Sequence, residues 1–197
     1  MPPRPFVSFR CATLSHKSPL QHACTLSWAL CKIKSYMNIY EKLEQLNHNQ
    51  AKIPQIKKYL LACCVKYIKY RSSGNLEKGI KVAQRFIAGR ATWKQLHNYE
   101  WLLEGEAFGI EYYRDGIQYY LVHPDLHMQN DLRKIRISER LSHVQAKEYL
   151  EHLAYFIVYV FSYCYRASND LPPEKYNRFL CPILFKKYFK SPVPINA

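Results

Sequence analysis

The spacing of apolar residues along most of the chain is that of amphipathic helices. From residue 39 onward, apolar side chains recur at intervals of three and four, first at Ile39, Tyr40, Leu43 and Leu46. Polar residues then interrupt the pattern before Pro54, and proline is favoured in the first turn of a helix. We therefore expect one helix from about residue 38, then a loop, and then a second helix that starts at Pro54.

The second expected helix, residues 54–71, separates apolar and basic residues onto opposite sides. At about 100° per residue, the apolar arc contains the adjacent Cys63 and Cys64, and the opposite arc contains Lys58, Lys66 and Lys69. A thiol among apolar side chains behaves as a small hydrophobe, and its pKa rises. Two cysteines at consecutive helical positions also diverge, which is poor geometry for a shared tetrahedral metal. We therefore expect two buried thiols that hold no metal.

The next stretch, residues 72–107, has the pattern of two helices joined by a short turn. Apolar residues at positions 76, 80, 83 and 87 share one helical face. Gly89 is a typical residue at the end of a helix, and Thr92 is placed to cap the helix that follows. Because so short a connection leaves little choice of direction, we expect an antiparallel helical hairpin.

A short β-hairpin is the one expected exception to the helical pattern. Asp115 and Gly116 stand between alternating residues, which is the strongest short hairpin signal in the chain. The sequence therefore predicts two short strands at about residues 111–122.

The C-terminal third of the chain predicts two more helices. Ser142 and Gln145 have the spacing of a capping box, which predicts a long helix that ends near Tyr165 and forms the centre of the core. Pro172 and Pro173 open another short helix. The expected fold is thus mainly α: a small helical bundle with a helical hairpin at about residues 54–107 and one short β-hairpin.

Length and composition are those of one folded domain. The chain has 197 residues, of which 48% are hydrophobic and 15% aromatic, so it is too apolar for a disordered chain. Its most apolar run, residues 153–165, is shorter than the roughly 18 residues of a membrane span. Polar residues follow Arg10, where a secretion signal would be apolar. We therefore expect a cytoplasmic protein whose seven cysteines are reduced thiols.

Residues 1–36 differ in composition from the rest of the chain. They contain three of the seven cysteines and five basic residues, but no Asp or Glu. Such a segment fits a basic, partly disordered arm, a transit peptide, or upstream sequence translated ahead of a true start at Met37. We therefore divide the chain into an N-terminal extension, 1–36, and a single helical domain, 37–197. Without the extension, 24 basic residues still outnumber 15 acidic ones.

The net charge of the chain is strongly positive, at +14 with an isoelectric point near 9.5. Such a charge attracts polyanions over about 8 Å at physiological salt. The candidate partner-binding residues lie in three basic stretches: Lys58, Lys66 and Lys69; Arg133, Lys134, Arg136 and Arg140; and Lys186, Lys187 and Lys190. In the last stretch the lysines alternate with Phe185, Tyr188 and Phe189, a mixture that suits nucleic acid. The other interpretation is that the aromatic residues pack and the lysines are solvated.

Three carboxylates provide an enzyme-like alternative. Glu104, Glu106 and Glu111 are close in sequence, and paired carboxylates can act as acid and base when burial separates their pKa values. On a helix, Glu104 and Glu111 share a face, whereas Glu106 points away. A solvated helical face, or partners for nearby lysines, is the other interpretation of this cluster.

The remaining candidates for special chemistry are weak. His123 and His127 have a spacing that can place two imidazoles on one metal, but no third ligand is determined by spacing, and a polar loop is the favoured interpretation. No phosphate-binding loop, nucleophile elbow or zinc-finger spacing occurs. We therefore expect no metal and no cofactor.

Two segments, "KKYLLACCVKYI" and "IKVAQRFIAGRATWKQL", resemble a stretch that recurs in uncharacterised bacterial proteins, common in planctomycetes. The likeness covers about residues 57–107. The matching residues are Val82, Ala83, Arg85, Phe86, Ala88, Gly89, Ala91 and Thr92. Gln84 stands where those proteins have an acid, and Ile87-Ala88 where they have Ala-Asp. The resemblance implies a shared helical unit and a bacterial origin, without an activity.

These observations favour a non-enzymatic, basic helical module that binds an acidic partner, either nucleic acid or an acidic protein. The alternative is an enzyme that uses the carboxylates at Glu104, Glu106 and Glu111. The two hypotheses differ in the surroundings that they require of those carboxylates: a shared cleft for catalysis, and separate exposure among lysines for binding.

Overall fold

The computed structural model describes residues 39–70, 74–115, 126–166 and 170–189, and every regular element in this part of the chain is helical. A first helix covers residues 39–47. It is followed by the short 3-10 helix η1 (Gln50–Lys52), α2 (Ile53–Ile68), α3 (Asn75–Ile87), α4 (Trp93–Asp115), α5 (Leu126–Glu139), α6 (His143–Tyr165), the 3-10 helix η2 (Glu174–Phe179) and α7 (Pro182–Phe189). The expected mainly α fold is confirmed.

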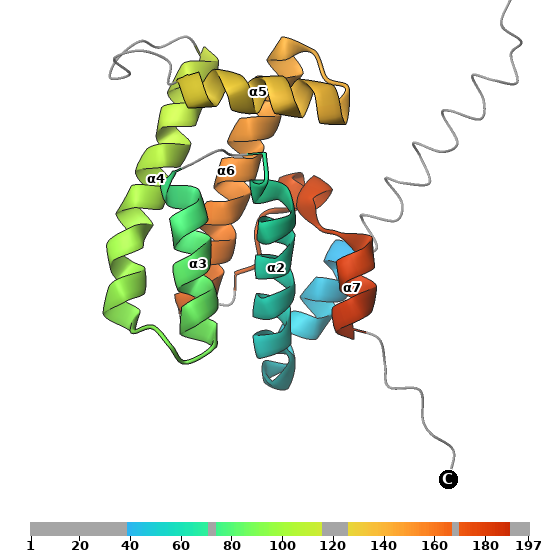
Figure 1. The fold of residues 1–197 in the computed structure, drawn as a ribbon. Coiled ribbons are helices and arrows are strands. Elements are labelled where there is room, and N and C mark those ends of the chain that lie inside the picture. Colours follow the sequence, from blue (N-terminus) through green and yellow to red (C-terminus); the bar gives the residue numbers. More distant parts are fainter. Residues whose placement is uncertain (1–38, 71–73, 116–125, 167–169, 190–197) are drawn as a thin grey trace, which may run out of the picture. The chain divides into compact units, whose positions relative to one another are not determined.

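The helices form a bundle around α6. In Figure 1, α2, α3 and α4 stand side by side, α6 runs behind them, and α5 lies across one end. Helix α6 contacts α2, α3, α4, α5 and η2. It was expected to be the central helix of the core, and this prediction is confirmed.

The sequence of α6 explains its central place. Apolar residues occur on almost all sides of this helix, and Leu153, Phe156, Ile157, Val160 and Phe161 are all buried. The helix begins at the predicted capping box: Gln145 donates its backbone N–H to the Ser142 hydroxyl, and Ser142 donates its own to the Gln145 side chain. A helix that is apolar on most sides is stable only where other helices cover it.

Helices α3 and α4 form the predicted hairpin. Gly89 ends the first helix with φ at +68°, a left-handed conformation that glycine adopts without strain. Thr92 and Gln95 form a second capping box, in which the Thr92 N–H lies 2.8 Å from Oε1 of Gln95. The two helices pack closely because Gly79 of α3 has no side chain where Leu103 of α4 fills the space.

The expected β-hairpin at residues 111–122 is wrong in the part that the structure describes. Residues 111–115 continue α4, and residues 116–122 lie outside the described ranges. These helical residues bring the Glu111 carboxylate to the Tyr155 hydroxyl and the Arg114 guanidinium to the Glu151 carboxylate, both on α6. Packing between α4 and α6 therefore outweighs the local turn preference of Asp115.

The segment after Pro172 and Pro173 is helical, as expected, but in two pieces. Helix η2 follows the two prolines, and Pro182 starts α7 in a first turn that requires no N–H from it. In the described ranges, no helix has both the length and the apolar character that crossing a bilayer requires.

Candidate nucleic-acid interface

Helix α7 packs along α2 through aromatic contacts. The ring of Tyr59 on α2 meets Phe185, Tyr188 and Phe189 of α7 edge to face, with ring centroids 5.6, 6.2 and 5.6 Å away. These contacts use the apolar side of α7 and leave Lys186 and Lys187 exposed. The aromatic residues of this stretch therefore pack, as one of the two sequence interpretations held, while its lysines face solvent.

The direction of α7 brings the first and third basic stretches together. Lys66, near the end of α2, places Nζ 3.0 Å from Sγ of Cys181, directly before α7. Gln55, near the start of α2, donates from its amide to the carbonyl of Tyr188 at the end of α7. The two helices are therefore antiparallel neighbours, and each carries exposed lysines.

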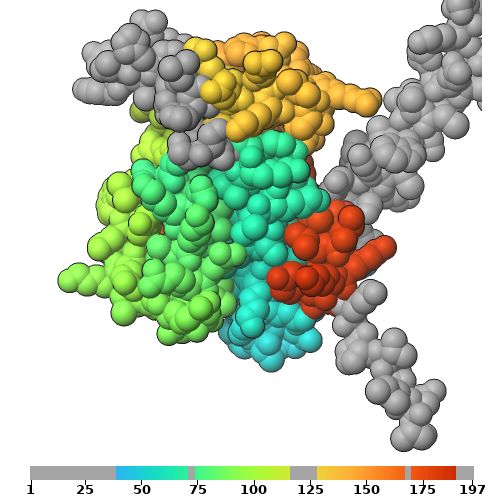
Figure 2. Space-filling view, viewed as in Figure 1, coloured from blue at the N-terminus to red at the C-terminus, as the bar shows by residue number. Residues whose placement is uncertain are grey.

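A groove of about 380 Å³ opens between α2, α3 and α7, and we call it the basic groove. Its lining residues are Lys58, Leu61, Ala62, Gln84, Ile87, Ala88, Arg90 and Tyr188. Figure 2 shows the face on which these three helices are exposed side by side. No carboxylate lines the groove, and neither α2 nor α7 contains Asp or Glu. The groove is therefore suited to an anion.

Sequence reasoning identified only one of the residues that give the groove its character. Lys58 was predicted, and Tyr188 was noted as an aromatic residue between lysines. Arg90 was missed because it belongs to the turn between α3 and α4, where its contact with the groove depends on how the hairpin packs. The sequence feature that could have identified Arg90 is a basic residue next to Gly89 in a short exposed turn.

Lys69 extends the basic surface along α2. Lys58 and Lys69 lie on the same side of this helix, about 16 Å apart, because eleven residues make close to three turns. The Lys69 ammonium lies 5.0 Å from the centre of the Tyr70 ring, and the Tyr70 hydroxyl donates to Glu139 of α5. Lys69, at the far end of α2 from Lys58, therefore lies close to α5.

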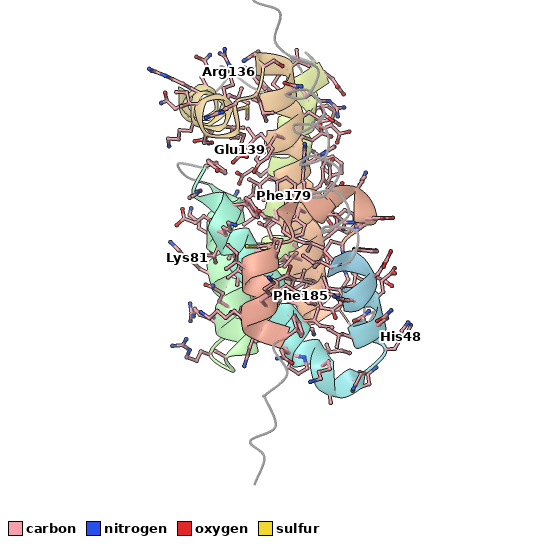
Figure 3. All side chains as sticks on the ribbon, turned by 90° about the vertical axis from the view of Figure 1, so that its right-hand side faces the viewer. His48, Lys81, Arg136, Glu139, Phe179 and Phe185 are labelled. Carbon is pink, nitrogen blue, oxygen red and sulfur yellow. The ribbon has the colours of Figure 1, made fainter. Side chains whose placement is uncertain are left out.

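The second basic stretch stays apart from the groove. Arg133 and Arg136 are exposed on one side of α5, and Arg140 follows in the turn after it with φ at +55°. Figure 3 shows Arg136 at the end of the domain opposite His48. Lys134 lies on the other side of α5 with Nζ 3.8 Å from the buried Asp131 carboxylate. The four residues therefore do not join the lysines of α7.

The two remaining predicted partner-binding residues are Lys66 and Lys190. Lys66 points to the Cys181 thiol, and its ammonium also lies 5.2 Å from the centre of the Tyr67 ring, so it serves the contact between α2 and α7. Lys190 lies outside the described residues. For the other basic residues a role in binding stays a prediction.

The vicinal thiols are buried, as expected. Cys63 and Cys64 are fully buried free cysteines. Burial raises the pKa of Cys63 to about 12, although hydrogen bonds from Cys181 and Tyr59 oppose the change. Burial also raises the pKa of Cys64, and the neighbouring Cys63 raises it further. Both thiols are therefore protonated and unreactive near neutral pH.

Cys181 was not singled out by the sequence, and it differs from the other thiols. Burial raises the pKa of its thiol, but the N–H of Leu184 and the Lys66 ammonium outweigh burial, so the net pKa is lowered. Its backbone N–H lies 3.4 Å from Sγ of Cys63. The contrast arises because the Cys181 sulfur is hydrogen-bonded both to the Lys66 ammonium and to backbone N–H groups at the start of α7.

The three carboxylates of the enzyme hypothesis have separate surroundings. Glu106 accepts hydrogen bonds from the N–H groups of Asn75 and Leu76, at 2.6 and 3.1 Å, and so caps the start of α3. Glu111 accepts a hydrogen bond from the Tyr155 hydroxyl. Glu104 faces a cavity beside α6. Two of the three therefore have structural partners on different helices.

In the ranges that the structure describes, no group of three or more His, Cys, Asp or Glu residues could hold a metal ion. His123, of the histidine pair considered above, lies outside those ranges.

Known proteins offer no match from which a function could be transferred to this chain. No protein family, no curated protein and no solved structure matches the chain. The likeness of residues 57–107 to bacterial proteins, and the origin that it implies, stay predictions.

Proposed function

We propose that the protein binds nucleic acid, with single strands preferred, through the basic groove and the lysines beside it. One observation carries the proposal: a groove lined by Lys58, Arg90 and Tyr188 has no carboxylate in its lining, and neither α2 nor α7 contains Asp or Glu. Cations neutralise phosphates, and an aromatic side chain supplies a surface for an unpaired base. Two further exposed cations, Lys69 directly after α2 and Lys187 on α7, add positive charge to helices that border the groove.

Titration of labelled oligonucleotides at two salt concentrations tests this function. We expect affinity to fall steeply as salt rises, because each neutralised phosphate releases a counterion. A single strand should bind more tightly than the corresponding duplex, because only an unpaired base can reach Tyr188. Fluorescence anisotropy measures both differences.

Charge reversal locates the site. Lys58→Glu and Arg90→Glu should each weaken binding about tenfold or more at low salt, and Lys186→Glu with Lys187→Glu should weaken it as well. Lys42→Glu is the matched control, because it changes the net charge equally at an exposed position of the helix of residues 39–47. If the groove variants bind as the control does, the groove is not the site. If the folded protein binds no oligonucleotide at low salt, an acidic protein partner replaces nucleic acid.

The enzyme hypothesis has no comparable support. Glu106 caps α3, and Glu111 accepts a hydrogen bond from the Tyr155 hydroxyl. Both carboxylates are therefore engaged in structural hydrogen bonds, and neither forms an acid–base pair with Glu104. Glu104 and Glu111 are also about 10 Å apart along the axis of α4, because seven residues separate them.

A further inference from the structure

A second cavity lies between α4 and α6, and it shares no lining residue with the basic groove. Its volume is about 330 Å³, within the range of small-molecule sites. The residues that give it character are Phe108, Tyr155, Tyr159 and Tyr163, which are aromatic, and Glu104 and Asp170, which are acidic.

Two of the tyrosines that line this cavity, Tyr155 and Tyr163, have their hydroxyls occupied by hydrogen bonds. The Tyr155 hydroxyl donates to Glu111, and the Tyr163 hydroxyl donates to Oδ1 of Asn47 at 2.6 Å. Phe108 meets Tyr155 edge to face with ring centroids 6.2 Å apart. Hydrogen bonds therefore set the orientation of the Tyr155 and Tyr163 rings, and ring packing supports Phe108 against Tyr155 and Tyr159 against Tyr176.

The charges in the cavity are those that a cation requires. Glu104 and Asp170 make no hydrogen bond or ion pair with the residues that the structure describes. Arg166 is the one basic residue in the lining, and its guanidinium is paired with the Glu100 carboxylate. Two uncompensated carboxylates in a protein of net charge +14 mark this cavity as different from the surface around it.

We infer that this cavity binds an organic ammonium cation with an alkyl body. An alkylated ammonium ion is attracted by aromatic faces, and each favourable ring contributes about 0.5–2 kcal/mol depending on how dry it is. The carboxylates supply the counter-charge, and the aromatic wall covers the alkyl groups. A bare metal ion would leave the rings without a role, whereas an anion would meet Glu104 and Asp170.

Choline and its neutral tert-butyl analogue, in which carbon replaces the charged nitrogen, test this inference. The two molecules have the same shape, so a difference between them reports charge alone. In calorimetric titrations of the full chain, choline should bind saturably, and the neutral analogue should bind at least about tenfold more weakly. Equal affinity for the two would overturn the inference, and so would absence of choline binding to the folded protein.

Variants of exposed lining residues assign the binding to this cavity. Glu104→Gln and Asp170→Asn remove charge while keeping shape, and each should weaken choline binding several-fold, while Tyr159→Leu should weaken it about tenfold. Glu148→Gln is the control, because it removes a charge from an exposed position of α6 outside the cavity. Tyr159 is 39% exposed, so its replacement leaves the core intact, and thermal melting confirms that each variant is folded. Equal binding by the cavity variants and the control would place choline elsewhere and overturn the assignment.

Discussion

Burial decides the chemistry of most thiols in the described part of the chain. Cys63, Cys64 and Cys164 are all buried, and burial is the largest cause of the raised pKa of each. Cys181 is also buried, yet a lysine and a backbone N–H at the start of α7 lower its pKa. The same side chain therefore differs in reactivity according to the charges that face it.

We predict that Cys63 and Cys64 react slowly with a thiol reagent in the native protein and rapidly after denaturation. The reagent needs an accessible thiolate, and the native protein offers neither access nor ionisation at these positions. Peptide mass spectrometry after timed labelling gives the rate for each cysteine. Rapid native labelling of Cys63 would show that its contact with Cys181 opens readily, and rapid labelling of Cys64 would show the same for the α2–α6 contact.

At the scale of the helices, termini and small residues determine how α3 and α4 meet. Their connecting turn depends on Gly89, and the other end of α3 depends on the Glu106 carboxylate of α4. Between these ends, Gly79 admits the side chain of Leu103. The hairpin is thus stabilised at both ends and along its length by contacts that pair one helix with the other.

Two glycine substitutions should have opposite effects on stability. Gly105→Ala in α4 adds a methyl group into open space, so the better helix propensity of alanine should stabilise the protein by about 0.5–1 kcal/mol. Gly79→Ala in α3 places Cβ 2.7 Å from Cδ2 of the buried Leu103. Overpacking should outweigh the propensity gain, with a net loss of about 1 kcal/mol.

Urea unfolding of the two variants measures these changes. Both substitutions are glycine to alanine within a helix, so each is the control for the other. Stabilisation by both would show that the Leu103 side chain makes room for the new methyl group without cost.

At the scale of the whole domain, the described core contains many groups that resist ionisation. Burial raises the pKa of Cys63 and of Cys164 from 9.0 to about 12. It also raises the pKa of Tyr59, Tyr149 and Tyr163. All these groups are neutral in the folded protein and become charged in alkaline solution once the chain unfolds.

Stability should therefore fall as pH rises above about 9. Below that pH, folded and unfolded states bind the same protons at these sites. Above it, the unfolded chain releases protons that the folded protein keeps, so alkali favours unfolding until the folded pKa near 12 is passed. Each buried thiol should cost about 1 kcal/mol between pH of about 8 and 10.

Urea midpoints across this pH range test the effect, and Cys164→Ala is the informative variant because it removes one of the groups. Its stability should fall less than that of the unaltered protein by about 1 kcal/mol over the same interval. Equal slopes would mean that the Cys164 thiol has an ordinary pKa when folded.

Local sequence patterns were sufficient for most helices and their ends. Helix ends are set by local effects: hydrogen bonds within the capping box at Ser142, and backbone conformation at Gly89 and Pro54. They can therefore be predicted without knowing the fold. The apolar arc of α2 likewise identified the buried thiols, because a helix with one apolar side must turn that side inward. By itself, the sequence thus determined the fold class, the helical hairpin and the burial of Cys63 and Cys64.

Only the tertiary structure decided where α4 ends and what the charged residues face. The turn signal at Asp115 is local, and it is outweighed by the contacts of Glu111 with Tyr155 and of Arg114 with Glu151 on α6. Lys58 of α2, Arg90 of the α3–α4 turn and Tyr188 of α7 line one groove, although long stretches of chain separate them. Glu104 of α4, Tyr159 of α6 and Asp170 line one cavity in the same way. Which residues come together in this way depends on the angles and directions at which helices pack. The pattern of apolar residues along a single helix does not specify these.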